Sequence, residues 1–297
     1  MEILNHVTVK PLRQLLLGLL CFGAVAVGLC AAESARRPVR VVSQTVGTDE
    51  LLLALAEPAQ IAALSHLAGN AAFSATAREA AAYPHIVLGD AETILRHAPT
   101  LVLCADYSRA DLVKQLERAG VRVVKFSRYK TLADAYANLR LLARELGPEA
   151  EARAERIVAD CEARVAALAA RLKDRPKVKV IAPSTFGLVP GYETTFQDLC
   201  DHAGAENLCA TLGQLRGHAP APIERMLTWP VAVVVLGATD RETALAPLRK
   251  LPPYQFMTAV QQSRVALLAP PYLSCVSHHR VDGYEALARA LHPEAFR

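Results

Sequence analysis

One long stretch near the middle of the chain decides the fold. Residues 148–173 read PEAEARAERIVADCEARVAALAARLK. Apolar residues recur in it three or four positions apart and so share one face of a helix; they are Ile157, Cys161, Val165, Leu168 and Leu172. Its 26 positions would span roughly 39 Å at about 1.5 Å per residue. Because the pattern on its two sides is repeated, we expect a stiff helix that joins two lobes; the alternative is a surface helix that packs on one lobe.

On the amino-terminal side, short apolar runs alternate with helical segments, which is typical of a parallel α/β sheet. Thr48 is expected to cap the first helix, with Asp49 and Glu50 in its first turn, where acidic residues suit the helix dipole. A long loop is expected over residues 66–89. The predicted strands are residues 39–42, 61–64, 101–104 and 121–126, and the predicted helices are residues 48–55, 91–97 and 109–119.

The carboxyl-terminal side repeats this plan. Thr195 is expected to cap its first helix, with Asp198 three residues on, at the spacing of a capping box. The predicted strands are residues 178–182, 231–236 and 265–268, the later helices are 224–228, 243–250 and 284–291, and loops are expected over 184–192 and 212–222. The predicted fold class is therefore α/β, with two Rossmann-like lobes of parallel sheet joined by a single long helix. We divide the chain into a signal peptide (1–32), an amino-terminal lobe (33–130), a helical linker (131–173) and a carboxyl-terminal lobe (174–297).

The first 32 residues have the pattern of a secretory signal. Lys10 and Arg13 precede an uncharged apolar run over residues 15–29, which is short for a membrane span of about 20 residues. Cleavage is expected after Ala32. An uncleaved anchor is one alternative. A lipoprotein attached through Cys30 is another, although Leu29 stands where a lipobox has a small residue.

Composition excludes several classes of protein. The 297 residues are 52% hydrophobic and 21% charged, which excludes a disordered chain. The net charge of +4 is spread along the sequence, so no nucleic-acid partner is expected. Five cysteines remain after signal cleavage, and Cys200 and Cys209 are the candidates for a disulfide that the sequence leaves open. No C-x-x-C motif and no dense His and acidic cluster occurs, so no bare metal site and no bound cofactor is expected.

Ligands of parallel α/β sheets bind beyond the carboxyl ends of the strands. Tyr side chains there can stack on a planar ligand or ligate haem iron, and Arg side chains can pair with ligand carboxylates. Arg280 is a further arginine of this kind; each arginine could instead be a solvated surface charge. The candidate ligand-binding residues follow predicted strands or lie in neighbouring loops, and are Thr45, Tyr83, Tyr107, Arg128, Tyr129, Phe186, Tyr192, Arg216, Tyr272 and His278.

Several segments, in their order along the chain, resemble the periplasmic substrate-binding proteins of ABC importers that carry iron–siderophore complexes, haem or vitamin B12. The likeness covers about residues 39–297, and no single segment is specific alone. The segments are VVS (41–43) with TDEL (48–51), ETILRHAP (92–99) running into LVL (101–103), TLADAY (131–136) with NLR (138–140), AGAEN (203–207) and LHPEAF (291–296).

The resemblance implies two lobes joined by one rigid helix, a ligand cleft between the lobes, and no enzyme activity. It also implies that Glu92 and Glu224, each near the start of a short helix that ends at a proline, dock onto arginines of the membrane permease. Pro99 follows Glu92 at the spacing of the family, whereas Pro230 follows Glu224 one residue early. A periplasmic monomer with an ABC permease and its ATPase as partners is the expected setting.

The expected ligand is a bulky metal chelate, namely an iron–siderophore complex or haem. Relatives that bind vitamin B12 often use Trp in the cleft, and the sole Trp229 stands in a short helix instead. A corrinoid ligand stays the alternative. A secreted α/β enzyme is a further one, suggested by the odd cysteine count and the adjacent His278 and His279. However, the S-x-x-K at residues 127–130 lacks its companion motifs, and no nucleotide-binding glycine motif occurs.

Overall fold

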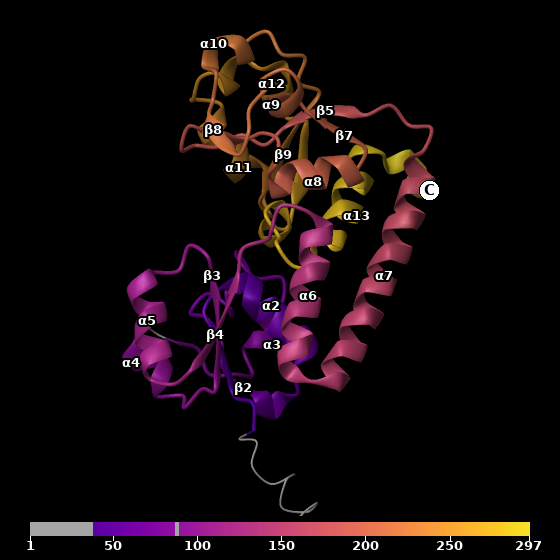
Figure 1. The fold of residues 1–297 in the computed structure, drawn as a ribbon. Coiled ribbons are helices and arrows are strands. Elements are labelled where there is room, and N and C mark those ends of the chain that lie inside the picture. The colour runs from indigo at the N-terminus through magenta and orange to yellow at the C-terminus, as the bar shows by residue number, and fades with distance from the viewer. Residues whose placement is uncertain (1–37, 87–88) are drawn as a thin grey trace, which may run out of the picture. The chain divides into compact units, whose positions relative to one another are not determined.

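Two parallel sheets and two long helices dominate the computed structural model, which describes residues 38–86 and 89–297 (Figure 1). Residues 39–297 form one compact unit. The predicted signal segment, residues 1–32, lies outside the described residues. Among the residues described, no helix has both the length and the apolar character that crossing a bilayer requires.

The first lobe carries a four-stranded parallel sheet. Its elements are β1 (Val41–Ser43), α2 (Val46–Leu55), η1 (Pro58–Gln60), β2 (Ile61–Ala63), α3 (Ala77–Ala80), α4 (Ala91–Leu95), β3 (Leu101–Ala105), α5 (Ala110–Arg118) and β4 (Arg122–Phe126). The strand order is β2-β1-β3-β4. Side chains alternate between the two faces, as the pleat requires: Val41 and Leu103 pack with α2, whereas Val42 and Val102 pack with α4 and α5.

The second lobe repeats this topology. Its elements are β5 (Val178–Ile181), β6 (Leu188–Pro190), α8 (Thr195–His202), β7 (Ala205–Asn207), α9 (Leu208–Thr211), β8 (His218–Pro220), α10 (Ile223–Met226), β9 (Val233–Gly237), α11 (Arg241–Leu248), η2 (Tyr254–Phe256), α12 (Thr258–Gln261), β10 (Val265–Leu268), η3 (Pro270–Leu273), α13 (Arg280–Leu291) and η4 (Pro293–Phe296). The strand order β10-β9-β5-β7 places the first strand of the lobe between its second and third, as in the first lobe. All neighbouring pairs in this sheet are parallel.

Two helices connect the lobes. Figure 1 shows α6 (Leu132–Leu146) and α7 (Pro148–Leu172) running side by side. Gly147 turns the chain between them with φ 115°, a conformation that glycine adopts without steric cost. The 25-residue α7 packs on α2 of the first lobe and on α8 and α13 of the second. The predicted fold class, two parallel α/β lobes with a long joining helix, is confirmed.

Local details differ from the sequence predictions at helix starts and in three loops, of which the one expected over residues 66–89 contains α3. The cap of α2 is Thr45, which accepts from the Thr48 backbone N–H; Thr48 lies three residues inside the helix and completes the capping box. Likewise Thr194, and not Thr195, caps α8. Residues 184–192 and 212–222 were expected to be loops, but they contain β6 and β8, which pair antiparallel.

Candidate functional site

The carboxyl ends of β1 and β3 form the natural binding position of the first lobe. The chain proceeds from β1 to β2 on one side and reaches β3 on the other, so the gap beyond β1 and β3 is the topological switch point. Gln44 and Thr45 follow β1, and Asp106 and Tyr107 follow β3. Their side chains therefore stand where parallel sheets bind ligands.

Three neighbouring cavities meet at Thr45 and Tyr107. The inter-lobe cavity has a volume of about 350 Å³ and is also bounded by Pro271, Ser274, Cys275 and Val276 of the second lobe. The tyrosine cavity, of about 100 Å³, reaches from Tyr107 to Tyr129 and Asn138. The outer cavity, of about 520 Å³, extends past His66 to Asp90 and Arg109. Together they form a hollow at the switch point that the second lobe partly covers.

Aromatic rings stand open on the wall of this hollow. Tyr107 is 72% exposed and Phe73 is 55% exposed, and both line the inter-lobe cavity. Tyr129 lies behind Tyr107, with ring centroids 6.3 Å apart and an interplanar angle of 56°. The Tyr129 hydroxyl donates to the Asp106 carboxylate. This hydrogen bond holds the Tyr129 ring in place beside Tyr107. Large exposed aromatic faces beside a cavity favour contact with a flat or apolar ligand.

The polar wall of the inter-lobe cavity is held by two adjacent buried carboxylates. Asp49 accepts from the Ser65 backbone N–H at 3.0 Å and from the Ser65 hydroxyl, and burial raises the pKa of Asp49 to about 6. Glu50 is 2% exposed and accepts from the Ala75 backbone N–H at 2.8 Å. His66, next to Ser65, is exposed and lines both the inter-lobe and outer cavities.

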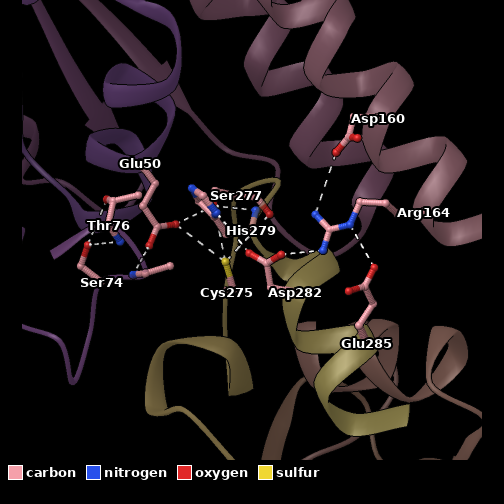
Figure 2. A network of polar contacts seen from close by, with 11 residues as sticks. Glu50, Ser74, Thr76, Asp160, Arg164, Cys275, Ser277, His279, Asp282 and Glu285 are labelled. Carbon is pink, nitrogen blue, oxygen red and sulfur yellow. Dashed lines mark hydrogen bonds and ion pairs between the residues drawn. The ribbon is translucent and has the colours of Figure 1, made fainter. Parts of the chain in front are cut away.

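Glu50 also contacts the second lobe. Ser277 Oγ donates to Glu50 Oε2 at 2.6 Å, and the Cys275 thiol lies 3.7 Å from the same oxygen (Figure 2). Burial, with the Glu50 carboxylate next, raises the pKa of Cys275 to about 12, so the thiol stays protonated. A methyl group on Gly47 would stand 2.4 Å from Val276 Cγ2, so a larger residue at this turn of α2 would force the Val276 side chain to move.

The polar contacts continue from this segment to α7. His279 Nδ1 lies 3.3 Å from Asp282 Oδ2, and Arg164 of α7 donates to Asp282 at 2.6 Å and to Glu285 at 2.9 Å (Figure 2). His278 lines a separate cavity of about 460 Å³ against α7, and its buried Nδ1 has no partner among the described residues. Burial, followed by the neighbouring His279, lowers the pKa of His278 to about 3.

A buried ion pair fixes the crossover between the first lobe and α6. Arg280 Nη1 donates to Asp198 Oδ2 at 2.9 Å, and the Tyr284 hydroxyl donates to the same carboxylate. Arg280 Nη2 donates to the carbonyl oxygens of Tyr129 and Cys275, each at 2.9 Å. The Asp198 carboxylate in turn accepts from the Leu132 backbone N–H at 3.3 Å. Arg280 therefore serves the fold and is not available to a ligand carboxylate.

The structure brings three of the ten predicted ligand residues together: Thr45, Tyr107 and Tyr129 line the cavities at the switch point. None of the other seven lines these three cavities. Tyr83 packs against the hydrophobic core, Arg128 is exposed after β4, and Phe186 is 91% exposed. Tyr192 forms a backbone β-bridge with Arg216, whose side chain pairs with Glu193. Tyr272 lies in η3, and His278 lines the cavity at α7.

Sequence reasoning missed three residues of the hollow: Glu50, His66 and Phe73. The sequence places Glu50 in the first turn of a helix, where it suits the dipole, yet its carboxylate contacts Ser277, 227 positions away. His66 and Phe73 lie in the loop after β2, where no strand end marks them. The available signal was an aromatic residue and a histidine in a long loop of a protein that has few aromatic residues.

The two predicted docking residues are both on the surface but have different surroundings. The Glu92 carboxylate is 83% exposed and lies 3.1 Å from Arg96, one turn along α4. Glu224 is exposed on α10, between Ile223 and Leu227, which are 48% and 51% exposed. Trp229, after α10, packs partly buried against the outer core of the second lobe.

The described residues include five cysteines and the side chains that could ligate a metal ion. Cys200 and Cys209 are buried and free, as are Cys104, Cys161 and Cys275. Within residues 38–86 and 89–297, no group of three or more His, Cys, Asp or Glu side chains is arranged to hold a metal ion.

Comparison with known proteins gives one family and several similar structures. Residues 41–272 match the family described as periplasmic binding protein. A periplasmic heme-binding protein from Roseiflexus sp. RS-1 matches with a TM-score of 0.75 and 22% identity, over 87% of this chain and 100% of that one. One from Pseudomonas aeruginosa matches with a TM-score of 0.71 and 26% identity, over 86% and 94%. A periplasmic vitamin B12 binding protein of Vibrio cholerae matches with a TM-score of 0.66 and 17% identity, over 87% and 98%. No curated protein matches the sequence.

Proposed function

Because the chain belongs to the periplasmic binding protein family, we propose that it captures a bulky iron chelate, an iron–siderophore complex or haem, and delivers it to the permease of an ABC importer. Family members are ligand carriers and not enzymes. The observation that carries the proposal is the hollow at the switch point of the first lobe, with Tyr107 and Phe73 exposed on its wall and the second lobe along one edge.

The chemistry of the wall suits a chelated metal better than a bare ion. Two exposed rings offer apolar area to a large ligand. The Tyr107 hydroxyl and the His66 imidazole are of the kinds that ligate haem iron. The heme-binding relatives favour haem, and the vitamin B12 relative keeps a corrinoid as the second candidate.

Membership in the family implies a periplasmic location, and we propose residues 1–32 as the export signal. For the partners, we propose a monomer that docks on a permease whose ATPase drives uptake. Glu92 and Glu224 are the proposed docking residues, because each carboxylate is exposed on a short helix, one in each lobe.

Since Glu92 lines none of the three cavities, changing it to alanine should lower uptake without changing ligand affinity.

Thermal unfolding with a panel of ligands tests the function. Haem, a ferric trihydroxamate, cobalamin and bare ferric ion are each added to the purified protein. We expect a chelate to raise the free energy of unfolding by about 2.7 kcal/mol at a concentration of about 100 Kd. Bare iron should give no specific shift, because the described residues offer it no ligand cluster. If no chelate stabilises the protein, the proposed function is wrong; stabilisation by cobalamin alone would select the corrinoid.

A further inference from the structure

The wall of the inter-lobe cavity has an unbalanced charge. Among the described residues that line it, Glu50 is the one acidic side chain, and none is Lys or Arg. The tyrosine cavity is lined by no charged side chain. The outer cavity has one of each sign, Asp90 and Arg109. Negative charge is therefore concentrated where the two lobes meet around the ligand position.

The structure builds this charge in place. Both Glu50 oxygens act as acceptors, the role of an ionised carboxylate: one accepts from the Ala75 backbone N–H at 2.8 Å and the other from Ser277 Oγ at 2.6 Å. The side chain is 2% exposed, so it cannot swing away from an incoming ligand. A fixed charge in a partly desolvated wall acts more strongly on a ligand than a surface charge does.

Neighbouring groups do not cancel the negative charge of Glu50. Asp49, the next residue, is also a buried carboxylate and makes the region more negative whenever it is ionised. Arg280, a buried cation that donates to the Cys275 carbonyl, is neutralised by Asp198 at 2.9 Å.

The other two arginines considered for ligand carboxylates also stand elsewhere. Arg216 pairs with Glu193, and Arg128 does not line the inter-lobe cavity. An anionic group placed in this cavity would thus face the Glu50 carboxylate and find no Lys or Arg among the described residues that line the cavity.

Resting on the proposed function, we propose that Glu50 selects the ligand by charge: the part of the chelate that enters the inter-lobe cavity is uncharged or cationic. Ferric trihydroxamates have this character, because three hydroxamate anions offset the ferric ion. Tris-catecholate complexes of iron are strongly anionic, and haem would have to keep its propionates out of this cavity, for example toward Arg109.

A charge series on one scaffold provides the test. A linear ferric trihydroxamate is used with its terminal amine free, acetylated or succinylated, which makes it cationic, neutral or anionic around the same metal centre. Calorimetric titration of the wild-type protein should give affinities that fall in that order, by about tenfold for each step in charge. In Glu50→Gln, the amide keeps the size of the side chain and the affinities should become nearly equal.

Ser277→Ala is the matched control. It removes a hydrogen bond of Glu50 to the second lobe but keeps the carboxylate, so the charge preference should persist even if all three affinities fall. A preference that is unchanged in Glu50→Gln, or lost equally in Ser277→Ala, would overturn the inference. Binding of an iron tris-catecholate with none of the hydroxamates bound would also overturn it, while leaving the proposed function intact; no binding of any chelate would overturn both.

Discussion

Replacing Arg280 with methionine is expected to lower the free energy of unfolding by about 3–5 kcal/mol, the usual cost of removing one partner from a buried ion pair. The Arg280 and Asp198 side chains are 3% and 8% exposed. Without the guanidinium, Asp198 stays as a buried charge whose cation is gone, and the carbonyl oxygens of Tyr129 and Cys275 lose their donor. Urea denaturation followed by circular dichroism measures the loss.

Two further variants test whether the loss of stability comes from burial of this ion pair, since the loss of an exposed ion pair should cost less. Arg249→Met breaks an exposed pair with Glu242, whose side chains are 39% and 66% exposed, and should cost at most about 1 kcal/mol. Adding Asp198→Asn to Arg280→Met removes the orphaned charge, so the double variant should be more stable than Arg280→Met alone. An Arg280→Met variant as stable as Arg249→Met would show that the pair does not fix the crossover to α6.

Acid is expected to destabilise the wild-type protein through His278. In the folded state its pKa is lowered from 6.5 to about 3, first by burial and then by His279, with Arg164 also lowering it and Asp282 opposing. Between these two values the unfolded chain binds a proton that the folded chain does not, so stability falls as the pH falls from 6.5 toward 3. The loss from this group is at most about 4–5 kcal/mol.

His278→Gln should therefore flatten the acid branch of a plot of unfolding free energy against pH, measured by urea denaturation from pH 7 to pH 4. Asp49→Asn should do the reverse. The raised pKa of Asp49 gives stability that is complete below its unfolded value of 3.8 and is lost as the pH rises through about 6. Removing it should steepen the acid loss. Parallel curves for wild type and His278→Gln would mean that His278 is protonated equally in both states.

The sequence predicted the fold class because the pattern that marks each strand and each helix lies within that element. Apolar runs such as residues 101–104 and the three-to-four spacing along residues 148–173 reflect burial within one strand or one helix. The position of Tyr107 was predictable for the same reason, since a ligand site at a strand end needs only the strand to be located.

The remaining features depend on contacts between distant segments, which a pattern along the chain does not show. Thr45 and Thr48 are both good capping residues three positions apart, and only the extended backbone at Thr45 decides between them. The sequence alone does not pair Arg280 with Asp198, because Asp198 is 82 positions away. Glu50 likewise meets Ser277 only once both lobes have folded.

Ligand titration of the wild type, Tyr107→Ala and Glu92→Ala, with a chelate that stabilises the wild type, tests the central claim most directly. Tyr107 stands at the meeting point of all three cavities, so its loss should weaken binding roughly tenfold, or about 1.4 kcal/mol. Glu92→Ala should bind like the wild type and reduce uptake through the reconstituted importer. If Glu92→Ala weakens binding while Tyr107→Ala binds normally, the ligand site is not at the switch point of the first lobe.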